Sequence, residues 1–201
     1  DTVPGSLSGV LPWAELFSLV LSPHAAELHL GAAALQDADR AGIARLLPGG
    51  PGPRTLPQPA TLQATLRPYQ QAGLDWMWEL HQLGLGGILA DDMGLGKTMQ
   101  VLALLCRERE QEPGRSGRTS RGESRLVGPT LLVCPMSVVG AWQREARAFA
   151  PHLAVHVHHG GDRIRDESFA AGAADMDLVI TTYALLARDL PVLQRVDWHR
   201  V

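Results

Sequence analysis

The chain has 201 residues, of which 45% are hydrophobic, and this is enough apolar material for one good core with at most a small appendage. Its formal net charge of -3 argues against a protein that binds nucleic acid through overall basicity, while leaving room for a local basic surface. The two cysteines fit no metal spacing or disulfide framework, and no apolar run approaches the roughly 20 residues of a membrane span, so a reducing cytoplasm is the expected location.

The first predicted elements are short helices in an Ala- and Leu-rich segment, residues 1–47, around Trp13–Leu21 and Asp37–Leu47. Residues 48–60, which begin PGGPGPRTLPQP, have the composition of a linker. A longer helix is predicted from Arg67 to about Leu83, because proline suits the first turn that follows its start. The sequence therefore predicts a small, mostly helical N-terminal segment ahead of a larger domain.

The larger domain, residues 61–201, alternates predicted strands with predicted helices. A Gly/Ser/Arg-rich stretch, Glu110–Gly128, interrupts this alternation and is predicted to be a flexible surface loop. Alternating elements with nearly continuous apolar strands predict an α/β fold, in which helices flank a parallel sheet. In chain order the elements are the strand Gly86–Ala90, the helix Lys97–Arg109, the strand Thr130–Cys134, the helix Val138–Ala150, the strands Ala154–His158 and Leu178–Thr182, and a strand that starts at Val201.

A glycine-rich loop, Asp91–Thr98 (DDMGLGKT), lies between the first of these strands and the helix after it. It fits the phosphate-binding pattern G-x-x-x-x-G-K-[ST], except that an aspartate replaces the first glycine. Gly94 and Gly96 allow the backbone to turn its N–H groups toward phosphate oxygens. Lys97 is suited to neutralise the β- and γ-phosphates, and the Thr98 hydroxyl to bind Mg²⁺. The residues expected to surround the phosphates are Asp92, Met93, Gly94, Leu95, Gly96, Lys97 and Thr98.

Lysine usage supports this interpretation of the loop. Of the 18 lysine and arginine residues in the chain, only Lys97 is a lysine. A guanidinium is a wide planar fork, whereas an ammonium is a compact point charge that fits a tight phosphate cradle. We therefore expect Lys97 to stand where arginine cannot replace it.

With its flanks, the loop closely resembles motif I of the Swi/Snf-type ATPases, double-stranded-DNA translocases of helicase superfamily two. The missing first glycine is the pattern expected of that superfamily. Within the family the chain looks closest to the bacterial branch, whose members carry an extra domain before the motor. The matching segments, which cover about residues 60–201, are Leu66–Gln70 (LRPYQ), Gly87–Leu105 (GILADDMGLGKTMQVLALL), Leu131–Trp142 (LLVCPMSVVGAW), His159–Gly161 and Leu178–Tyr183 (LVITTY).

This resemblance implies a first RecA-like lobe that binds ATP with Mg²⁺ and contacts the backbone of double-stranded DNA. Lys97 and Thr98 would be its catalytic residues, and Thr98 would reach Mg²⁺ through ATP. The side-chain amide of Gln70 would hydrogen-bond the adenine edge, because an amide offers a donor and an acceptor side by side. The positions implied to approach DNA are Pro135, Met136, Ser137, Thr181 and Thr182.

The resemblance also bears on the ends of the chain. Residues 1–47 would be the tail of the preceding accessory domain, in a bacterial cytoplasmic protein. The sequence stops at Val201, before the Asp-Glu motif that holds Mg²⁺ in relatives and before their second RecA-like lobe. We therefore expect the full-length parent to be a DNA-dependent ATPase, and the 201-residue polypeptide alone to have negligible ATPase activity.

Alternative functions remain open on the sequence alone. An RNA helicase of the same superfamily is one, although the DEAD-box loop A-x-T-G-x-G-K-T does not match DDMGLGKT. A nucleotide-gated interaction module without hydrolysis is another, and a protein-binding scaffold centred on residues 1–47 is a third. The histidines His156, His158 and His159 raise the question of a metal, but no carboxylate or cysteine lies nearby at ligand spacing.

Overall fold

The computed structural model describes residues 37–111 and 127–201. The chain divides into two compact units and crosses between them after Pro53, after Trp78 and after Gly87; the second of these crossings lies within a helix. The described residues of the first unit come from 37–53 and 79–87, and those of the second from 54–78, 88–111 and 127–201. The predicted helix at 13–21 lies outside the described residues, as does most of the predicted loop at 110–128.

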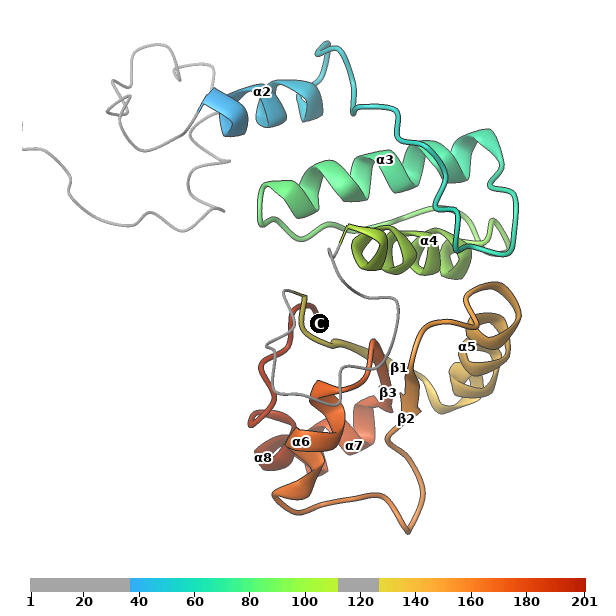
Figure 1. Ribbon diagram of the computed structural model, residues 1–201, viewed down its shortest axis with the longest axis vertical. Coiled ribbons are helices and arrows are strands. Elements are labelled where there is room, and N and C mark those ends of the chain that lie inside the picture. Colours follow the sequence, from blue (N-terminus) through green and yellow to red (C-terminus); the bar gives the residue numbers. More distant parts are fainter. Residues whose placement is uncertain (1–36, 112–126) are drawn as a thin grey trace, which may run out of the picture. The chain divides into compact units, whose positions relative to one another are not determined.

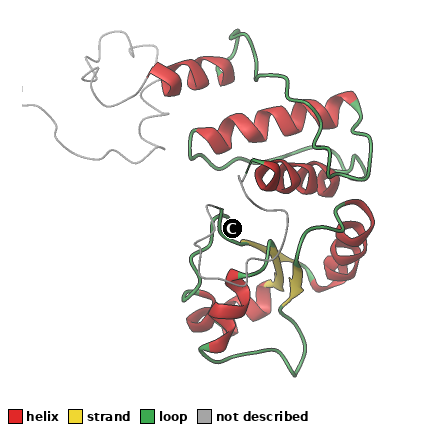
Figure 2. Cartoon of the chain, viewed as in Figure 1, coloured by secondary structure: helices red, strands yellow, loops and turns green. Residues whose placement is uncertain are grey.

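Helices are more numerous than strands in the described residues (Figure 2). The helices are α2 (Asp37–Leu46), α3 (Pro68–Gln82), α4 (Lys97–Glu110), α5 (Met136–Phe149), α6 (Ser168–Ala174), α7 (Tyr183–Arg188) and α8 (Leu190–Leu193). The strands are β1 (Thr130–Cys134), β2 (Val155–Val157) and β3 (Leu178–Thr182).

In the first unit, a partly buried ion pair joins α2 to the C-terminal part of α3. The Arg45 guanidinium donates from Nε to Glu79 Oε1 at 2.9 Å, and its Nη2 contacts the same oxygen. A Cβ on Gly42 would lie 2.9 Å from a methyl carbon of Leu83, so the two helices approach closely where glycine leaves room. Ile43 of α2 is also buried.

The second unit contains a three-stranded parallel sheet in the order β1-β3-β2. The central strand β3 pairs with β1 from Thr130↔Leu178 to Cys134↔Thr182, and every residue of β3 is buried. Central parallel strands are covered on both faces, which explains why LVITT shows no alternation between buried and exposed positions. All three strands run the same way, so their C-terminal ends meet at one edge of the sheet.

Helices cover both faces of this sheet, as Figure 1 shows for α5 on one side and α6, α7 and α8 on the other. Successive residues of β3 point to opposite faces. Accordingly, Leu178 and Ile180 belong to an apolar cluster that also contains residues of α4 and α5. Val179 instead joins a second cluster with Phe169 of α6 and Leu193 of α8. The predicted α/β fold, with a parallel sheet flanked by helices, is therefore confirmed.

One predicted strand is wrong. Residues Gly86–Ala90 form no strand, and Ile88 is 87% exposed where a buried strand was predicted. A strand exists only when a neighbour takes its backbone hydrogen bonds, and the described strands pair among themselves. Two adjacent glycines also weaken the intrinsic preference of this segment for extended structure.

The other predicted helices and strands among the described residues are confirmed to within two residues at either end. The three short helices α6, α7 and α8 were not predicted. Near Val201, where a strand start was predicted, Arg200 forms an isolated parallel bridge with Thr130. Among the described helices, none is long and apolar enough to cross a lipid bilayer.

Candidate nucleotide-binding site

The loop Asp91–Thr98 makes its turn at two glycines. Gly94 has φ +86° and Gly96 has φ +77°, and both values lie in the left-handed region that other residues rarely adopt. Helix α4 begins directly after Gly96, so the free N–H groups of its first turn and the positive end of its dipole are at the loop. The local backbone is therefore suited to an anion.

Lys97, the first residue of α4, folds its side chain back across this loop. Its ammonium Nζ donates to the backbone carbonyl of Asp91 at 2.6 Å and to that of Asp92 at 2.8 Å. Thr98 follows in the same helical turn and is half-buried. The structure thus brings together a cation, a hydroxyl and the helix N-terminus, which is the donor set that a polyphosphate and its divalent cation require.

The other loop residues predicted around the phosphates lie on the outside of the turn. Asp92 and Gly94 are exposed, and the side chain of Met93 is 96% exposed. Leu95 is half-buried, and a Cβ on Gly94 would meet no atom within 4 Å. Among the described residues, no hydrogen bond from these side chains closes the loop, so the groups here that are suited to a phosphate are the backbone N–H groups and Lys97.

Gln70, in the first turns of α3, is buried against the loop. Its Oε1 accepts a hydrogen bond from the Arg67 backbone at 2.9 Å, and its Nε2 donates to the carbonyl of Leu95 at 3.0 Å. A Cβ on Gly96 would lie only 2.5 Å from this Nε2. The amide thus touches the loop backbone, and each of its ends keeps one further hydrogen-bonding position for another partner.

Gln100 is a neighbour of the loop that the sequence analysis missed. It is fully buried in α4, and its Nε2 donates to Asp91 Oδ2 at 2.9 Å. The only signal for it was a polar residue within the apolar run MQVLALL.

The residues predicted to approach DNA follow the C-terminal ends of β1 and β3. Pro135, Met136 and Ser137 are exposed at the start of α5. Because Cys134 pairs with Thr182, this segment and the end of β3 are adjacent along the sheet edge. Thr181 and Thr182 themselves are buried, so neither side chain is presented to solvent.

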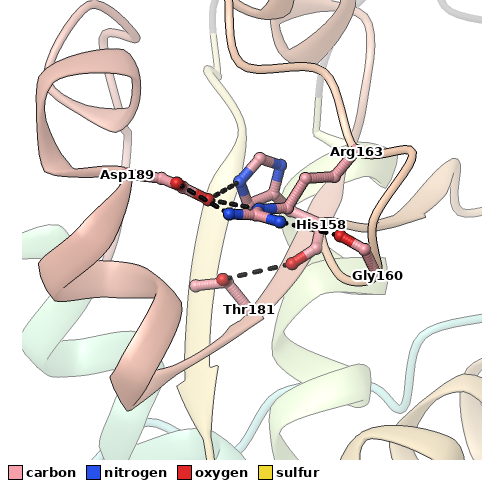
Figure 3. Close-up of polar contacts among 5 residues, drawn as sticks. All are labelled: His158, Gly160, Arg163, Thr181 and Asp189. Carbon is pink, nitrogen blue, oxygen red and sulfur yellow. Dashed lines mark hydrogen bonds and ion pairs between the residues drawn. The ribbon is translucent and has the colours of Figure 1, made fainter.

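Thr181 instead takes part in a polar network behind this edge, shown in Figure 3. Its hydroxyl donates to the backbone carbonyl of His158 at 3.3 Å, and the His158 ring nitrogen Nε2 lies 3.0 Å from Asp189 Oδ2. Arg163 contacts both oxygens of the Asp189 carboxylate and donates from Nη1 to the carbonyl of Gly160 at 2.8 Å. The network fixes the exposed segment His159–Gly161 to the ends of β2 and β3.

The surroundings of Asp189 favour its ionised carboxylate. The hydrogen bond from the Arg163 guanidinium lowers the pKa of Asp189 to about 2, against the opposing effect of burial and with help from His158. Burial lowers the pKa of His156, which precedes the network on β2. The His158 ring packs at a tilt of 59° against Phe169, with ring centroids 4.7 Å apart, so its neighbours here include an aromatic ring and the Asp189 carboxylate.

The chain is similar in sequence to a family of known proteins. The model of the SNF2-related domain family matches residues 69–201. The Bacillus subtilis protein YwqA is 40% identical over 141 residues, which are 70% of this chain and 14% of YwqA. The TATA-binding protein-associated factor MOT1 of Saccharomyces cerevisiae is 37% identical over 141 residues, which are 70% of this chain and 7% of MOT1. The chain thus spans less than a fifth of the length of these relatives.

A solved structure supports the same assignment. The Sulfolobus solfataricus SWI2/SNF2 ATPase core in complex with dsDNA is 39% identical, with a TM-score of 0.58. The match covers 73% of this chain and 27% of that chain. The three comparisons agree with the RecA-like fold and the family resemblance that the sequence analysis gave.

Proposed function

Because this chain belongs to the SNF2-related domain family, we propose that it forms the ATP-binding part of a DNA-dependent ATPase. The observation that carries the proposal is the placement of the Lys97 ammonium across a glycine loop at the N-terminus of α4. A cation, a helix dipole and free backbone N–H groups converge there, and all three favour a polyphosphate. DNA-dependent ATP hydrolysis by a protein that contains this chain is part of the same proposal.

Within this site we propose a role for each residue. Lys97 neutralises the β- and γ-phosphates, while the loop residues Asp92–Gly96 wrap the phosphates through their backbone N–H groups. Thr98 offers its hydroxyl to Mg²⁺, and bound Mg²⁺ would neutralise negative charge on the phosphates. Gln70 uses the remaining donor and acceptor of its amide for the adenine edge, which favours ATP over GTP.

The partner that we propose is double-stranded DNA, bound along the C-terminal edge of the sheet. Ser137 and the backbone N–H groups that begin α5 are exposed there and are suited to contact phosphates. Pro135 and Met136 flank them. The burial of Thr181 and Thr182 favours an indirect role in which they hold this edge in shape, and a direct DNA contact by their side chains would require the edge to rearrange. The DNA in the related Sulfolobus complex supports this choice of partner.

The predicted domain limits also remain part of the proposal: residues 1–47 as the end of an accessory domain, 48–60 as a linker and 61–201 as the ATP-binding lobe. A bacterial cytoplasmic location is proposed on the likeness to a Bacillus protein, although other relatives are fungal and plant proteins.

The test is an ATP-hydrolysis assay on the longest natural protein that contains this chain, with duplex DNA, duplex RNA or no nucleic acid. We expect duplex DNA to stimulate hydrolysis and RNA to have little effect, and Lys97→Ala to abolish the stimulated rate. Stimulation by RNA in place of DNA would favour an RNA helicase. ATP binding without hydrolysis under every condition would favour a nucleotide-gated module and would contradict the proposed activity.

A further inference from the structure

The buried side chain of Gln100 has an unusual environment for an amide. Its exposed fraction is 0%, and its Nε2 donates to Asp91 Oδ2. Its Oε1, by contrast, has no hydrogen-bond partner among the residues that the structure describes. A methionine of similar length would fill the same volume without burying an unpaired carbonyl, so packing alone does not explain an amide here.

Helix α3 is shaped to accept this amide. A Cβ on Gly73 would lie 1.8 Å from Gln100 Oε1 and 3.0 Å from its Cδ, so a side chain there would force the Gln100 amide to move. Glycine within a helix costs conformational entropy relative to alanine, and here it makes space for the Gln100 amide. One side chain therefore joins α3, α4 and the first residue of the phosphate loop.

Asp91 is hydrogen-bonded both to Gln100 and to Lys97. Asp91 accepts from Gln100 through its carboxylate and from Lys97 Nζ through its backbone carbonyl. At the other end of the loop, Gln70 binds the carbonyl of Leu95. The two glutamines thus anchor opposite ends of the loop, one from each helix.

We propose that Gln100 is a positioning residue for ATP binding: its amide, seated against Gly73, fixes Asp91 and thereby the position of the Lys97 ammonium. This inference rests on the proposed function, because it assigns Lys97 to the phosphates. It predicts that Gln100 affects ligands that reach the β- and γ-phosphate positions, and has little effect on ligands that do not. A residue that only stabilises the fold would affect both kinds of ligand alike.

The first test compares ATP and AMP binding to the 201-residue chain by titration calorimetry or NMR. Gln100→Met keeps the volume but removes the hydrogen bond to Asp91, and we expect about tenfold weaker ATP binding, the effect of one hydrogen bond to a charged group. AMP binding is expected to change by less than about twofold, because its single phosphate does not reach the Lys97 position. An equal loss for both nucleotides, or no loss for ATP, would overturn the proposal.

Gln58→Met is the matched control. Gln58 is a half-buried glutamine of the same unit, whose amide hydrogen-bonds the backbone of Ala64 and Leu66 away from the loop. This variant loses two amide hydrogen bonds but should leave the ATP Kd unchanged at the same fraction of folded protein. A comparable loss of ATP affinity in Gln58→Met would show that the effect of Gln100 is only a general loss of structure.

A second variant remains informative if Gln100→Met fails to fold. Gly73→Ala raises helix propensity, yet its Cβ displaces the Gln100 amide, so we expect ATP binding to weaken by a similar factor without loss of helical structure. In a Gln100→Ala background the displaced atoms are gone, and Gly73→Ala should have no further effect. Unchanged ATP affinity in Gly73→Ala alone would refute the proposal.

The failure of this inference can be told apart from the failure of the proposed function. If the wild-type chain binds no ATP, the nucleotide site itself is wrong. If the wild type binds ATP and both Gln100→Met and Gly73→Ala bind it equally well, the site stands and Gln100 has no positioning role.

Discussion

Replacing Gly96 by alanine should destabilise the chain for two separable reasons. The first is conformational: Gly96 has φ +77°, and an alanine in the left-handed region costs about 1–2 kcal/mol. The second is steric, because the new Cβ would lie 2.5 Å from Gln70 Nε2 and would displace its hydrogen bond to Leu95, worth about 0.5–1.5 kcal/mol. The expected loss in the free energy of unfolding is therefore roughly 1.5–3.5 kcal/mol.

Gly94 provides a matched comparison in the same loop. It has φ +86°, but a Cβ there would meet no atom within 4 Å, so Gly94→Ala should cost only the conformational part, about 1–2 kcal/mol. The difference between the two variants, about 1 kcal/mol, isolates the contact with Gln70. In a Gln70→Ala background this difference should disappear.

Urea unfolding of the purified chain, followed by circular dichroism, measures both losses. A difference of about 1 kcal/mol lies above the usual error when the slopes of the transitions agree. Equal losses for Gly94→Ala and Gly96→Ala, or a difference that persists without Gln70, would refute the argument that this amide packs on the loop backbone.

Three further predictions concern the rest of the second unit. The pKa of Asp189 is lowered from 3.8 to about 2 in the folded state, so its ionised form contributes stability that is present above pH 4 and is lost as the pH falls from about 4 to about 2. The urea concentration at the midpoint of unfolding should therefore decrease over this pH range in the wild type, and should decrease less in Asp189→Asn. Cys106 is fully buried, and burial raises the pKa of its thiol to about 12; burial also raises the pKa of Cys134. A thiol reagent should therefore label neither cysteine until denaturant is added, and rapid labelling of the native chain would contradict this burial. Arg200→Met removes the hydrogen bonds from the Arg200 guanidinium to the buried carboxylate of Glu108, while His199 Nε2 stays 4.0 Å from that carboxylate. It should lower the free energy of unfolding by roughly 1.5–3 kcal/mol, and a loss below about 0.5 kcal/mol would show that these hydrogen bonds contribute little to stability.

The sequence predicts those parts of the fold that local chemistry determines. The strands TLLVC and LVITT have the limits predicted for them, because each is an unbroken run rich in aliphatic and β-branched residues, the composition typical of buried parallel strands. The helix after the phosphate loop is also predictable, because Lys97 follows a glycine in a known strand–loop–helix pattern. By contrast, Gly86–Ala90 shows that an apolar run does not make a strand without a pairing neighbour.

Contacts between residues that are far apart in the chain were not predicted from the sequence. Arg163 and Asp189 are 26 residues apart, and nothing in either local sequence identifies the other as its partner. The buried amide of Gln100 depends on a glycine 27 positions earlier, which only the packing of α3 against α4 reveals. The hydrogen bond from the Thr181 hydroxyl to the His158 carbonyl is a contact of the same kind, because the two residues are 23 positions apart in the chain.

The central claim is that the loop Asp91–Thr98 holds the phosphates of ATP through Lys97. The most direct measurement is a calorimetric titration of the 201-residue chain with ATP and Mg²⁺, comparing the wild type with Lys97→Ala. Loss of a charged hydrogen-bonding group should weaken binding by about tenfold to a hundredfold, measured at a temperature where both proteins are folded, because the variant also loses two hydrogen bonds to the loop carbonyls. Equal ATP affinity in the two proteins would contradict the account.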